Sequence, residues 1–408
     1  MSNWRAVRLG DLTSKIGSGV TPTGGSEIFT ESGVLFIRSQ NIKNNLVDTT
    51  DNKYIPELID EKMRNSRVIK NDVLYNITGA SIGRSAVFGL AERANVNQHV
   101  CILRIKNENP NFIQYALASD VGAKNLWGFQ AGGNREGLNF QQLASYKLSL
   151  PEKLEQDRIV TVLKTWDECL GVLKTKIALK KKQQKGLTHH LLTGETRLRG
   201  FSEEWKAYKL SDLFTVKKGH GLSKDKLSKD GNPCILYGEI YTRYDEVIDS
   251  VVSKTSVNEG LRSKINDILI PASTTTSGLD LATAAVLLED DVLLGGDINV
   301  LRPKTVLSGV FVSLLLSSVK KHDLARRAQG ITIVHLYGKD ILNVSVKLPR
   351  YDEQFEIANV MLKLREEINI LEARRDYVLL QKKYLLKNLI TGAIRTPETL
   401  TPKERTYA

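Results

Sequence analysis

The side chains that could carry out catalysis are few, and their spacing does not match an active site. Asp60-Glu61-Lys62 resembles the end of a nuclease carboxylate motif, but Pro56-Glu57, the only acidic-proline element before it, stands too close. Asn109-Pro110-Asn111-Phe112 approaches the Asn/Asp-Pro-Pro-aromatic motif that holds a flipped adenine, yet the chain contains no Pro-Pro. Asn109 is better interpreted as the cap of a short helix.

Other chemistry also lacks its residues. No glycine-rich loop ends in Lys-Ser/Thr, so ATP hydrolysis is not indicated. Three widely separated cysteines, Cys101, Cys169 and Cys234, form neither a disulfide framework nor a zinc pattern, and the six histidines do not cluster. We therefore expect no catalytic residue, no metal site and no cofactor bound by this chain.

Composition describes a globular protein with an excess of positive charge. Hydrophobic residues make up 41% of the 408 positions and charged residues 25%, and the formal net charge is +12. Such a charge attracts phosphate polyanions, but it does not by itself distinguish a nucleic-acid binder from a merely basic protein. Apolar runs are too short to cross a membrane, and the N-terminus lacks the pattern of a signal peptide. We expect a reducing, cytoplasmic location.

The elements that would position any functional residue occur twice. Matching residues keep one offset of 198, without a gap, over a span of more than forty positions. The matches include Leu150-Pro151 with Leu348-Pro349, Glu155-Gln156 with Glu353-Gln354, and Thr193-Gly194 with Thr391-Gly392. A second match, offset by 201 residues, joins Trp4 and Asp11 to Trp205 and Asp212. The register is too long for coincidence, so the chain is a tandem duplication.

Between the matched segments lie two regions that share only sparse landmarks. Among these are Asp72-Val73-Leu74 against Asp267-Ile268-Leu269, and Arg104 against Arg302. Short β-rich runs broken by Gly and Asn predict mixed α/β globules.

The matched segments themselves predict two long helices. Apolar residues recur in alternating steps of three and four, which is the pattern of a coiled-coil seam. The seam residues are Ile159, Leu163, Trp166, Leu170, Leu173, Ile177, Leu187 and Leu191 in the first copy, and Ile357, Val360, Leu364, Ile368, Leu371, Val378, Leu385 and Leu389 in the second. Two such helices in one chain most simply pack against each other, antiparallel if the halves are related by a pseudo-twofold axis.

Polar residues interrupt the seam. Lys180 and Gln184 occupy seam positions in the first copy, and Arg375 and Lys382 do so in the second. Polar residues at such places often fix the register of two helices at some cost in stability. The run Lys180-Lys181-Lys182 is typical of a solvated helix face, with a partner-facing surface as the alternative.

Two divergent globules alternating with two near-identical helices resemble the specificity (S) subunit of type I restriction-modification enzymes. The marks are Leu-Pro-x-x-x-Glu-Gln-x-x-Ile, from Leu150 to Ile159 and from Leu348 to Ile357, and the Thr-Gly helix ends. A third is the linker from Leu198 to Trp205. The resemblance covers the chain to about Thr396, although the N-terminal copy lacks the Arg-Gly-Phe that introduces the second.

The resemblance implies an α+β chain with two α/β target-recognition domains separated by an antiparallel two-helix coiled coil. Each domain would read one half of a bipartite, asymmetric site in double-stranded DNA. The helices would set the spacing and dock two methylation (M) subunits, which hold S-adenosylmethionine, and restriction (R) subunits would join the full complex. The expected divisions are 1–150, first target-recognition domain; 151–194, first helix; 195–348, linker and second domain; 349–393, second helix; and 394–408, tail.

Within such domains, base reading needs Arg, Asn, Gln and hydroxyl side chains on loops near strand ends. The candidates in the first domain are Arg38, Ser39, Gln40, Asn41, Asn76, Thr78, Arg84, Gln98, Asn134 and Arg135. The candidates in the second are Tyr237, Glu239, Tyr241, Arg243, Thr274, Thr275, Arg326, Arg327, Gln329 and Thr332. Any one of them could instead be a solvated loop residue or contact a phosphate.

Two other classes of function compete with this interpretation. A non-enzymatic coiled-coil scaffold with protein-binding heads would show the same helices, but it gives no reason for the basic charge. A DNA-modifying enzyme would need the catalytic motifs that this chain lacks.

Overall fold

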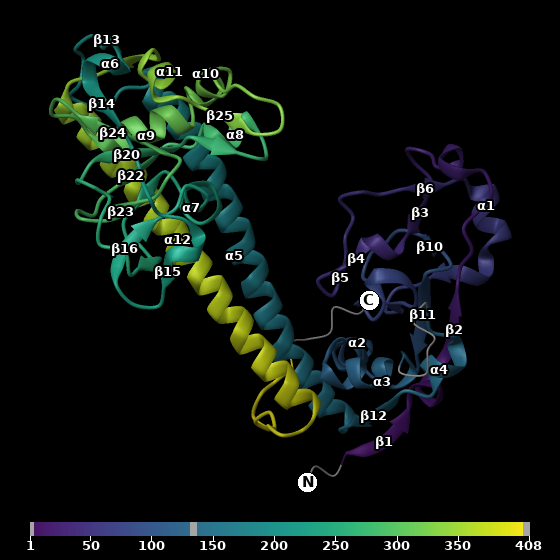
Figure 1. Cartoon of the computed structure of the whole chain (residues 1–408). Coiled ribbons are helices and arrows are strands. Elements are labelled where there is room, and N and C mark those ends of the chain that lie inside the picture. Colours follow the sequence, from purple (N-terminus) through teal and green to yellow (C-terminus); the bar gives the residue numbers. More distant parts are fainter. Residues whose placement is uncertain (1–3, 131–136, 403–408) are drawn as a thin grey trace. The chain divides into compact units, whose positions relative to one another are not determined.

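The computed structural model describes residues 4–130 and 137–402, which divide into two compact units (Figure 1). Unit 1 comprises Met1–Lys174 and Arg374–Ala408, and unit 2 comprises Thr175–Ala373. Each unit contains one globular head and a part of each of two long helices. Within the described ranges, no helix combines the length and the hydropathy that a membrane crossing demands.

Each head is closed by its own first and last strands. In the first head β1 (Arg5–Arg8) pairs antiparallel with β12 (Lys147–Leu150). In the second head β13 (Lys206–Lys209) pairs in the same way with β26 (Ser345–Leu348). Because β12 and β26 lead directly into the long helices, this pairing anchors the chain before and after each head.

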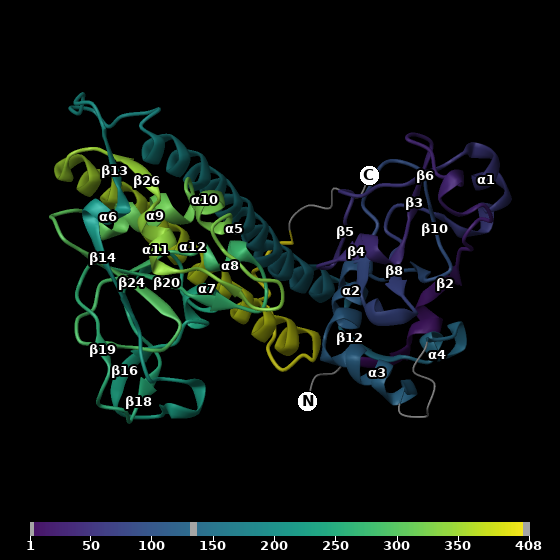
Figure 2. The ribbon, with the colours of Figure 1, turned by 45° about the horizontal axis from the view of Figure 1, so that its top comes forward.

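The first head contains two four-stranded sheets (Figure 2). One has the order β2-β11-β8-β9 and is antiparallel, with β2 (Thr13–Ser18), β11 (Val100–Ile105), β8 (Val73–Asn76) and β9 (Ser85–Val87). The other has the order β6-β3-β10-β7, with β6 (Tyr54–Ile55), β3 (Val34–Ile37), β10 (Ala94–Val96) and β7 (Arg67–Val68). In this sheet β3 and β10 are parallel.

The second head also contains two main sheets, each with five strands. Its first sheet has the order β14-β24-β20-β22-β17, with β14 (Phe214–Lys218), β24 (Ile298–Pro303), β20 (Asp267–Pro271), β22 (Ala285–Leu287) and β17 (Val247–Ile248). Its second has the order β15-β18-β16-β23-β19, with β15 (Leu227–Ser228), β18 (Lys254–Thr255), β16 (Asn232–Ile235), β23 (Leu293–Leu294) and β19 (Leu261–Arg262). Here β16 and β23 form the parallel pair. Four strands of each sheet keep the order found in the first head, and β17 and β15 are added at the sheet edges.

A buried helix packs on the first sheet described for each head. These helices are α2 (Pro110–Ala118) and α9 (Gly309–Ser317). The side chain of Asn109 accepts hydrogen bonds from the backbone N–H groups of Asn111 and Phe112, which confirms its interpretation as a helix cap. An edge-to-face aromatic contact repeats as well, Trp4 with Phe112 and Trp205 with Phe311.

The sparse landmarks of the two heads are matching buried ion pairs. Arg104 binds Asp72 through Nε and Nη2, both at 2.9 Å, and Arg302 binds Asp267 at 2.9 and 2.6 Å. Each carboxylate also accepts a backbone N–H three residues before it. Both aspartates are almost fully buried, so these residues recur because they hold the sheet together.

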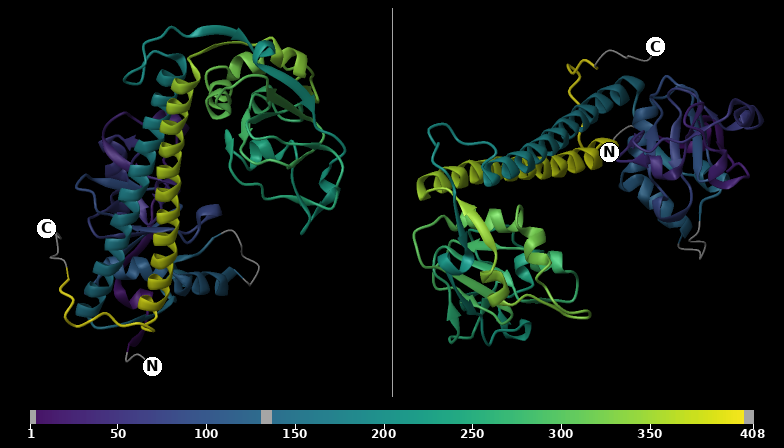
Figure 3. Two further views of the ribbon diagram at one scale, coloured as in Figure 1. Left: turned by 90° about the vertical axis from the view of Figure 1, so that its left-hand side faces the viewer. Right: turned by 90° about the horizontal axis from the view of Figure 1, so that it is seen from above.

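The two long helices are α5 (Lys153–Thr193) and α12 (Tyr351–Ile390), which lie side by side (Figures 1 and 3). They begin two residues after Pro151 and Pro349, and Gly194 and Gly392 follow their ends with positive φ angles of 76° and 71°. The predicted α+β organisation, two α/β heads and a pair of long helices that pack together, is confirmed.

Seam residues account for most of the apolar burial along this pair. Buried are Ile159, Leu163, Leu170, Leu173, Ile177, Leu191, Ile357, Ile368, Leu371, Val378 and Leu389, while Trp166, Leu187, Val360, Leu364 and Leu385 are half-buried. Two polar seam residues are paired across the helices: Lys382 with Asp167 in unit 1, and Lys180 with Glu367 in unit 2. As numbers rise along α5 they fall along α12, which makes the pair antiparallel.

The repeated Glu-Gln motif forms a corner at the start of each long helix. Gln156 accepts the backbone N–H of Asn109 and donates to the carbonyl of Pro151. Gln354 does the same with the N–H of Ser308 and the carbonyl of Pro349. Each glutamine thus fixes the helix start to the loop before the buried helix of its head.

The glutamate of each motif binds an arginine that follows the end of the other long helix. In unit 1, Arg395 pairs with Glu155 through both carboxylate oxygens. In unit 2, Arg197 pairs with Glu353 in the same fork, at 2.5 and 2.6 Å. Such bidentate pairs have a defined geometry. Each corner therefore connects one head, the start of one long helix and the segment that follows the other.

The landmark ion pairs generate a prediction about stability. Asp267→Ala is expected to lower the free energy of unfolding by about 3 kcal/mol, because it leaves the Arg302 guanidinium and a backbone N–H without their acceptor. Urea denaturation followed by circular dichroism measures the change. The matched control is Glu203→Ala, which removes an ion pair with Arg350 in which both side chains are about two-thirds exposed; it should cost less than about 1 kcal/mol. Equal losses would contradict the structural role of Asp267.

Candidate nucleic-acid interface

In the first head, loops from both sheets converge at one end. The pairings of Ser18 with Cys101 and of Asn76 with Val100 bring the ends of β2 and β8 to the start of β11. The loop after β10 joins them: the Gly19 N–H donates to the Asn97 carbonyl, and the Asn97 N–H donates to the Ile37 carbonyl. Four loops therefore meet, and they carry eight of the ten predicted reading residues.

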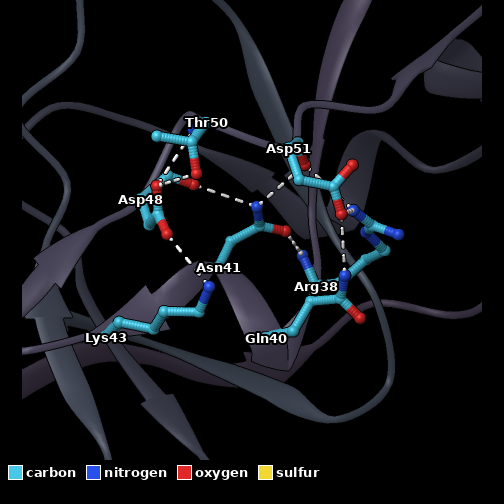
Figure 4. Close-up of polar contacts among 7 residues, drawn as sticks. All are labelled: Arg38, Gln40, Asn41, Lys43, Asp48, Thr50 and Asp51. Atoms are coloured by element: carbon cyan, nitrogen blue, oxygen red, sulfur yellow. Dashed lines mark hydrogen bonds and ion pairs between the residues drawn. The ribbon is translucent and has the colours of Figure 1, made fainter. Parts of the chain in front are cut away.

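The loop after β3 is ordered by Asn41 and Asp51 (Figure 4). The Asn41 side chain is buried, accepts the Arg38 backbone N–H, and donates to the carbonyls of Asp48 and Asp51. The Asp51 carboxylate accepts from Arg38 Nη2 and Gln40 Nε2, each at 2.9 Å. Arg38 and Gln40 are thus held together in one orientation, whereas Asn41 shapes the loop from within.

Ionisation of the two aspartates matches this arrangement. The hydrogen bond from the Arg38 guanidinium, with its positive charge, lowers the pKa of Asp51 below its usual value. The hydroxyl and N–H of Thr50, together with Lys43, lower the pKa of Asp48 to about 2. Both carboxylates are charged at neutral pH. The charge of Asp51 balances that of Arg38, and the charge of Asp48 balances that of Lys43.

Asn76 ties the loop after β8 to the loop after β3. Its side chain is fully buried and donates to the carbonyl of Ser39 at 2.9 Å and to the hydroxyl of Ser81 at 3.0 Å. Its Oδ1 is buried without a partner among the described residues. The backbone of Asn76 pairs with that of Arg84, and this hairpin presents the exposed Arg84 side chain.

The remaining candidates of the first head lie around the start of β11. Gln98 is exposed and hydrogen-bonds Thr21 from the loop after β2. Thr78 is half-buried and shares a hydrogen bond with His99 Nδ1. Asn134 and Arg135 fall on residues 131–136, outside the described part of the chain.

In the second head the candidates follow the equivalent strands. Tyr237, Glu239, Tyr241 and Arg243 come after β16, the counterpart of β3. Glu239 accepts from the Leu236 N–H, Arg243 and Ser253, so both of its oxygens are occupied. Glu239 therefore orders this loop, while Tyr237 and Arg243 remain exposed.

The other candidates of the second head surround the end of β20. Thr274 is buried and pairs with Val334 in the short ladder of β21 (Ser273–Thr274) with β25 (Val334–His335), whereas Thr275 is exposed. Arg326, Gln329 and Thr332 are exposed, and Arg327 is half-buried. These residues lie at the end of β20, just as the cluster of the first head lies at the end of the equivalent strand β8.

The same backbone contact fixes this segment in both heads. The Leu138 N–H donates to the Ile77 carbonyl at 2.8 Å, and the Leu336 N–H donates to the Ala272 carbonyl at 2.9 Å. Leu138 and Leu336 thereby lie beside the loops that follow β8 and β20. Asp51 and Ser253 also belong to the clusters, although no sequence signal separated them from other polar loop residues.

The residues that could have suggested catalysis have structural partners. Asp60 is fully buried and accepts from Arg67 and Asn95. Within 4–130 and 137–402, no group of three or more His, Cys, Asp or Glu side chains could hold a metal ion.

Comparisons with known proteins agree with this arrangement. The family model described as "Type I restriction modification DNA specificity domain" matches residues 1–181 and 202–380. A relative from Methanocaldococcus jannaschii, the putative type I restriction enzyme MjaX specificity subunit, is 23% identical over 96% of this chain and 94% of its own length. The type I restriction enzyme EcoBI specificity subunit of Escherichia coli is 33% identical over 32% of this chain and 28% of its own.

A solved structure shares the fold. The S subunit of a type I restriction-modification system from M. genitalium superimposes with a TM-score of 0.60 at 16% identity, over 95% of this chain and 96% of that one.

The cluster around Asp51 generates a prediction about DNA selection. Asp51→Ala releases Arg38 and Gln40, so the preference for the specific site over random DNA should fall about tenfold, the value of one good side-chain contact to a base. Competition binding with fluorescent duplexes measures this ratio. Asp48→Ala is the matched control, because it removes an equal charge and leaves the Asp51 contacts intact. Equal ratios for the two variants would show that Asp51 does not order reading residues.

Proposed function

Since the chain belongs to the type I restriction-modification DNA specificity family, we propose that its two loop clusters read the two halves of one DNA target. The chain is the DNA specificity subunit of a type I complex, which recognises the target and assembles with M subunits. Members of this family are not catalytic, and S-adenosylmethionine is bound by the M subunits. The family assignment decides against the protein-binding scaffold.

The observation that carries the proposal is the position of the clusters. Two heads with a common order of central strands carry exposed Arg, Gln, Tyr and Thr side chains at the same end of equivalent strands. Base edges are read by such donors and acceptors, and flanking cations contact phosphates. We assign residues 1–150 and 195–348 as the two target-recognition domains.

The two half-sites should differ in sequence. The first cluster presents Arg38, Gln40 and Gln98, whereas the second presents Tyr237 and Gln329. Different donor and acceptor patterns select different base pairs, so the full target is asymmetric. Within each cluster, we assign the buried Asn41 and Asn76 to positioning the loops rather than to base contact.

The long helices have two functions in this proposal. As a spacer, the 41 residues of α5 span about 60 Å at 1.5 Å per residue, more than one DNA turn of about 34 Å. As a docking surface, residues 151–194 and 349–393 would receive two M subunits, and R subunits would join the full complex. Because the target is cellular DNA, we place the protein in the cytoplasm.

An apolar stripe on α12 supports the docking function. Tyr377, Leu380 and Tyr384 stand at positions i, i+3 and i+7 of one helix face and are 62%, 67% and 61% exposed. Large apolar side chains grouped in this way mark protein interaction sites. The stripe lies outside the seam, so a helix of an M subunit could pack on it without opening the α5–α12 pair.

The spacer function predicts the outcome of a paired deletion. Removing residues 178–184 and 365–371 takes one heptad from each helix and both partners of the Lys180–Glu367 ion pair. The rise of about 1.5 Å per residue predicts a loss of about 10 Å, so the preferred spacer should shorten by about three base pairs. Methylation profiling of a host that carries the variant with its M subunit measures both spacer and half-sites.

The control for this deletion keeps the helix length. Leu179→Ala with Ile370→Ala changes two exposed residues inside the deleted segments and should leave the spacer unchanged. A deletion variant that keeps the original spacer would exclude the helices as the element that sets spacing, and altered half-sites would contradict the assignment of reading to the heads.

The docking function predicts the effect of charge in the apolar stripe. Tyr377→Glu with Tyr384→Glu should weaken binding of the M subunit at least tenfold, because two carboxylates would be buried without partners. Isothermal titration calorimetry measures the affinity. Leu379→Glu is the control, since Leu379 is 53% exposed on another face of the same helix. Equal affinities for all three proteins would exclude the stripe as the docking site.

A further inference from the structure

A short hairpin lies at the reading end of the second head. Its two arms are joined by a bridge between Gln329 and His335, whose backbones exchange hydrogen bonds of 2.8 and 2.7 Å. Gly330 has a φ of +122°, and a Cβ there would lie 2.0 Å from the Ile333 carbonyl oxygen. Only glycine can make this turn, so the tip formed by Ile331 and Thr332 is held in a tight conformation.

The base of the hairpin is fixed to the loop that follows β20. Ser273 pairs with His335 and Thr274 pairs with Val334. The His335 ring stacks on Tyr337 with a centroid distance of 6.0 Å and an interplanar angle of 17°. β21, β25 and α8 (Gly278–Leu281) lie together at this edge of the head (Figure 1). The tip is therefore oriented before any ligand binds.

The side chain at the tip is unusual for a soluble surface. Ile331 is 100% exposed and Ile333 is 48% exposed, and no other large apolar side chain in the described ranges is as exposed as Ile331. Contact with water gives an isoleucine no favourable interaction, whereas burial of its methyl groups against another apolar group does. Its polar neighbours Gln329 and Thr332 are exposed as well.

These groups match the edge of one base pair. In the major groove an A·T pair presents the thymine 5-methyl group beside the adenine N7 acceptor and N6 donor. An aliphatic side chain contacts the methyl group, and a glutamine amide can bond both adenine atoms. Phosphates attract cations rather than aliphatic side chains, and the thymine methyl is the apolar group that the major groove presents at a base edge.

We propose that the hairpin from Gln329 to His335 enters the major groove at an A·T pair of the second half-site and that Ile331 packs on the thymine methyl group. Gln329 bonds the adenine of the same or the adjacent pair, and the exposed Arg326 contacts a neighbouring phosphate. This inference rests on the proposed function and adds to it a residue and the base that this residue selects.

Uracil substitution tests the contact, because uracil differs from thymine only in lacking the methyl group. The full chain with its M subunits is bound to duplexes that carry the preferred site, with each thymine replaced singly by uracil. For the wild-type protein, one position in the second half-site should lose about fourfold in affinity, the value of one buried methyl group. Ile331→Ala should bind the thymine duplex about fourfold more weakly and lose nothing further with uracil at that position.

Val306→Ala is the matched control, because Val306 is a β-branched residue of the same unit that is 80% exposed away from the hairpin. It should keep the wild-type affinity and the full uracil effect. Both variants should unfold at the wild-type temperature, since neither side chain is packed. Three results would overturn the inference: Ile331→Ala retaining the uracil effect, the wild-type protein showing no uracil effect, or a second half-site without an A·T pair. A wild-type complex without any sequence preference would instead refute the proposed function itself.

Discussion

The architecture depends on the corner that Glu-Gln makes at the start of each long helix. The glutamine donates a hydrogen bond to the carbonyl of the preceding proline and accepts one from a loop N–H of its own head. The glutamate forms an ion pair with an arginine that follows the end of the other long helix. One dipeptide therefore orients a head and secures the two helices against each other. None of the candidate reading residues takes part in these corner contacts, so reading and assembly use different residues.

This separation explains what the sequence could and could not predict. Periodicity identified the seam, because apolar residues at steps of three and four have one stable solution, a partner helix. The duplication was visible because the corner residues recur at one offset in both halves. The chemistry behind it was not visible: Asp267 and Arg302 were landmarks without an explanation until their buried ion pair was described.

The candidate site was less predictable for a physical reason. A polar residue in a loop can face solvent or tie the loop together, and residue type does not distinguish these cases. Asn76 and Glu239 have the chemistry of base readers, but their side chains hydrogen-bond other loop residues, Ser39 and Ser253. Conversely, Ile331 was absent from the polar candidates because an apolar residue in a loop is ordinarily assigned to packing. Asn134 and Arg135 remain predictions.

The ion pairs within the helix pair do not follow the repeat. At the offset of 198 residues, Lys382 corresponds to Gln184 and Asp167 corresponds to Arg365, so the Lys382–Asp167 pair has no counterpart in unit 2. The two repeats therefore have the same type of backbone structure but ion pairs at different positions. Two copies of one partner protein that bound the two repeats would contact the same backbone arrangement with different charged side chains. They would therefore bind at different concentrations. The two repeats of the helix pair therefore present different side chains, and two identical partners would bind them with different affinities.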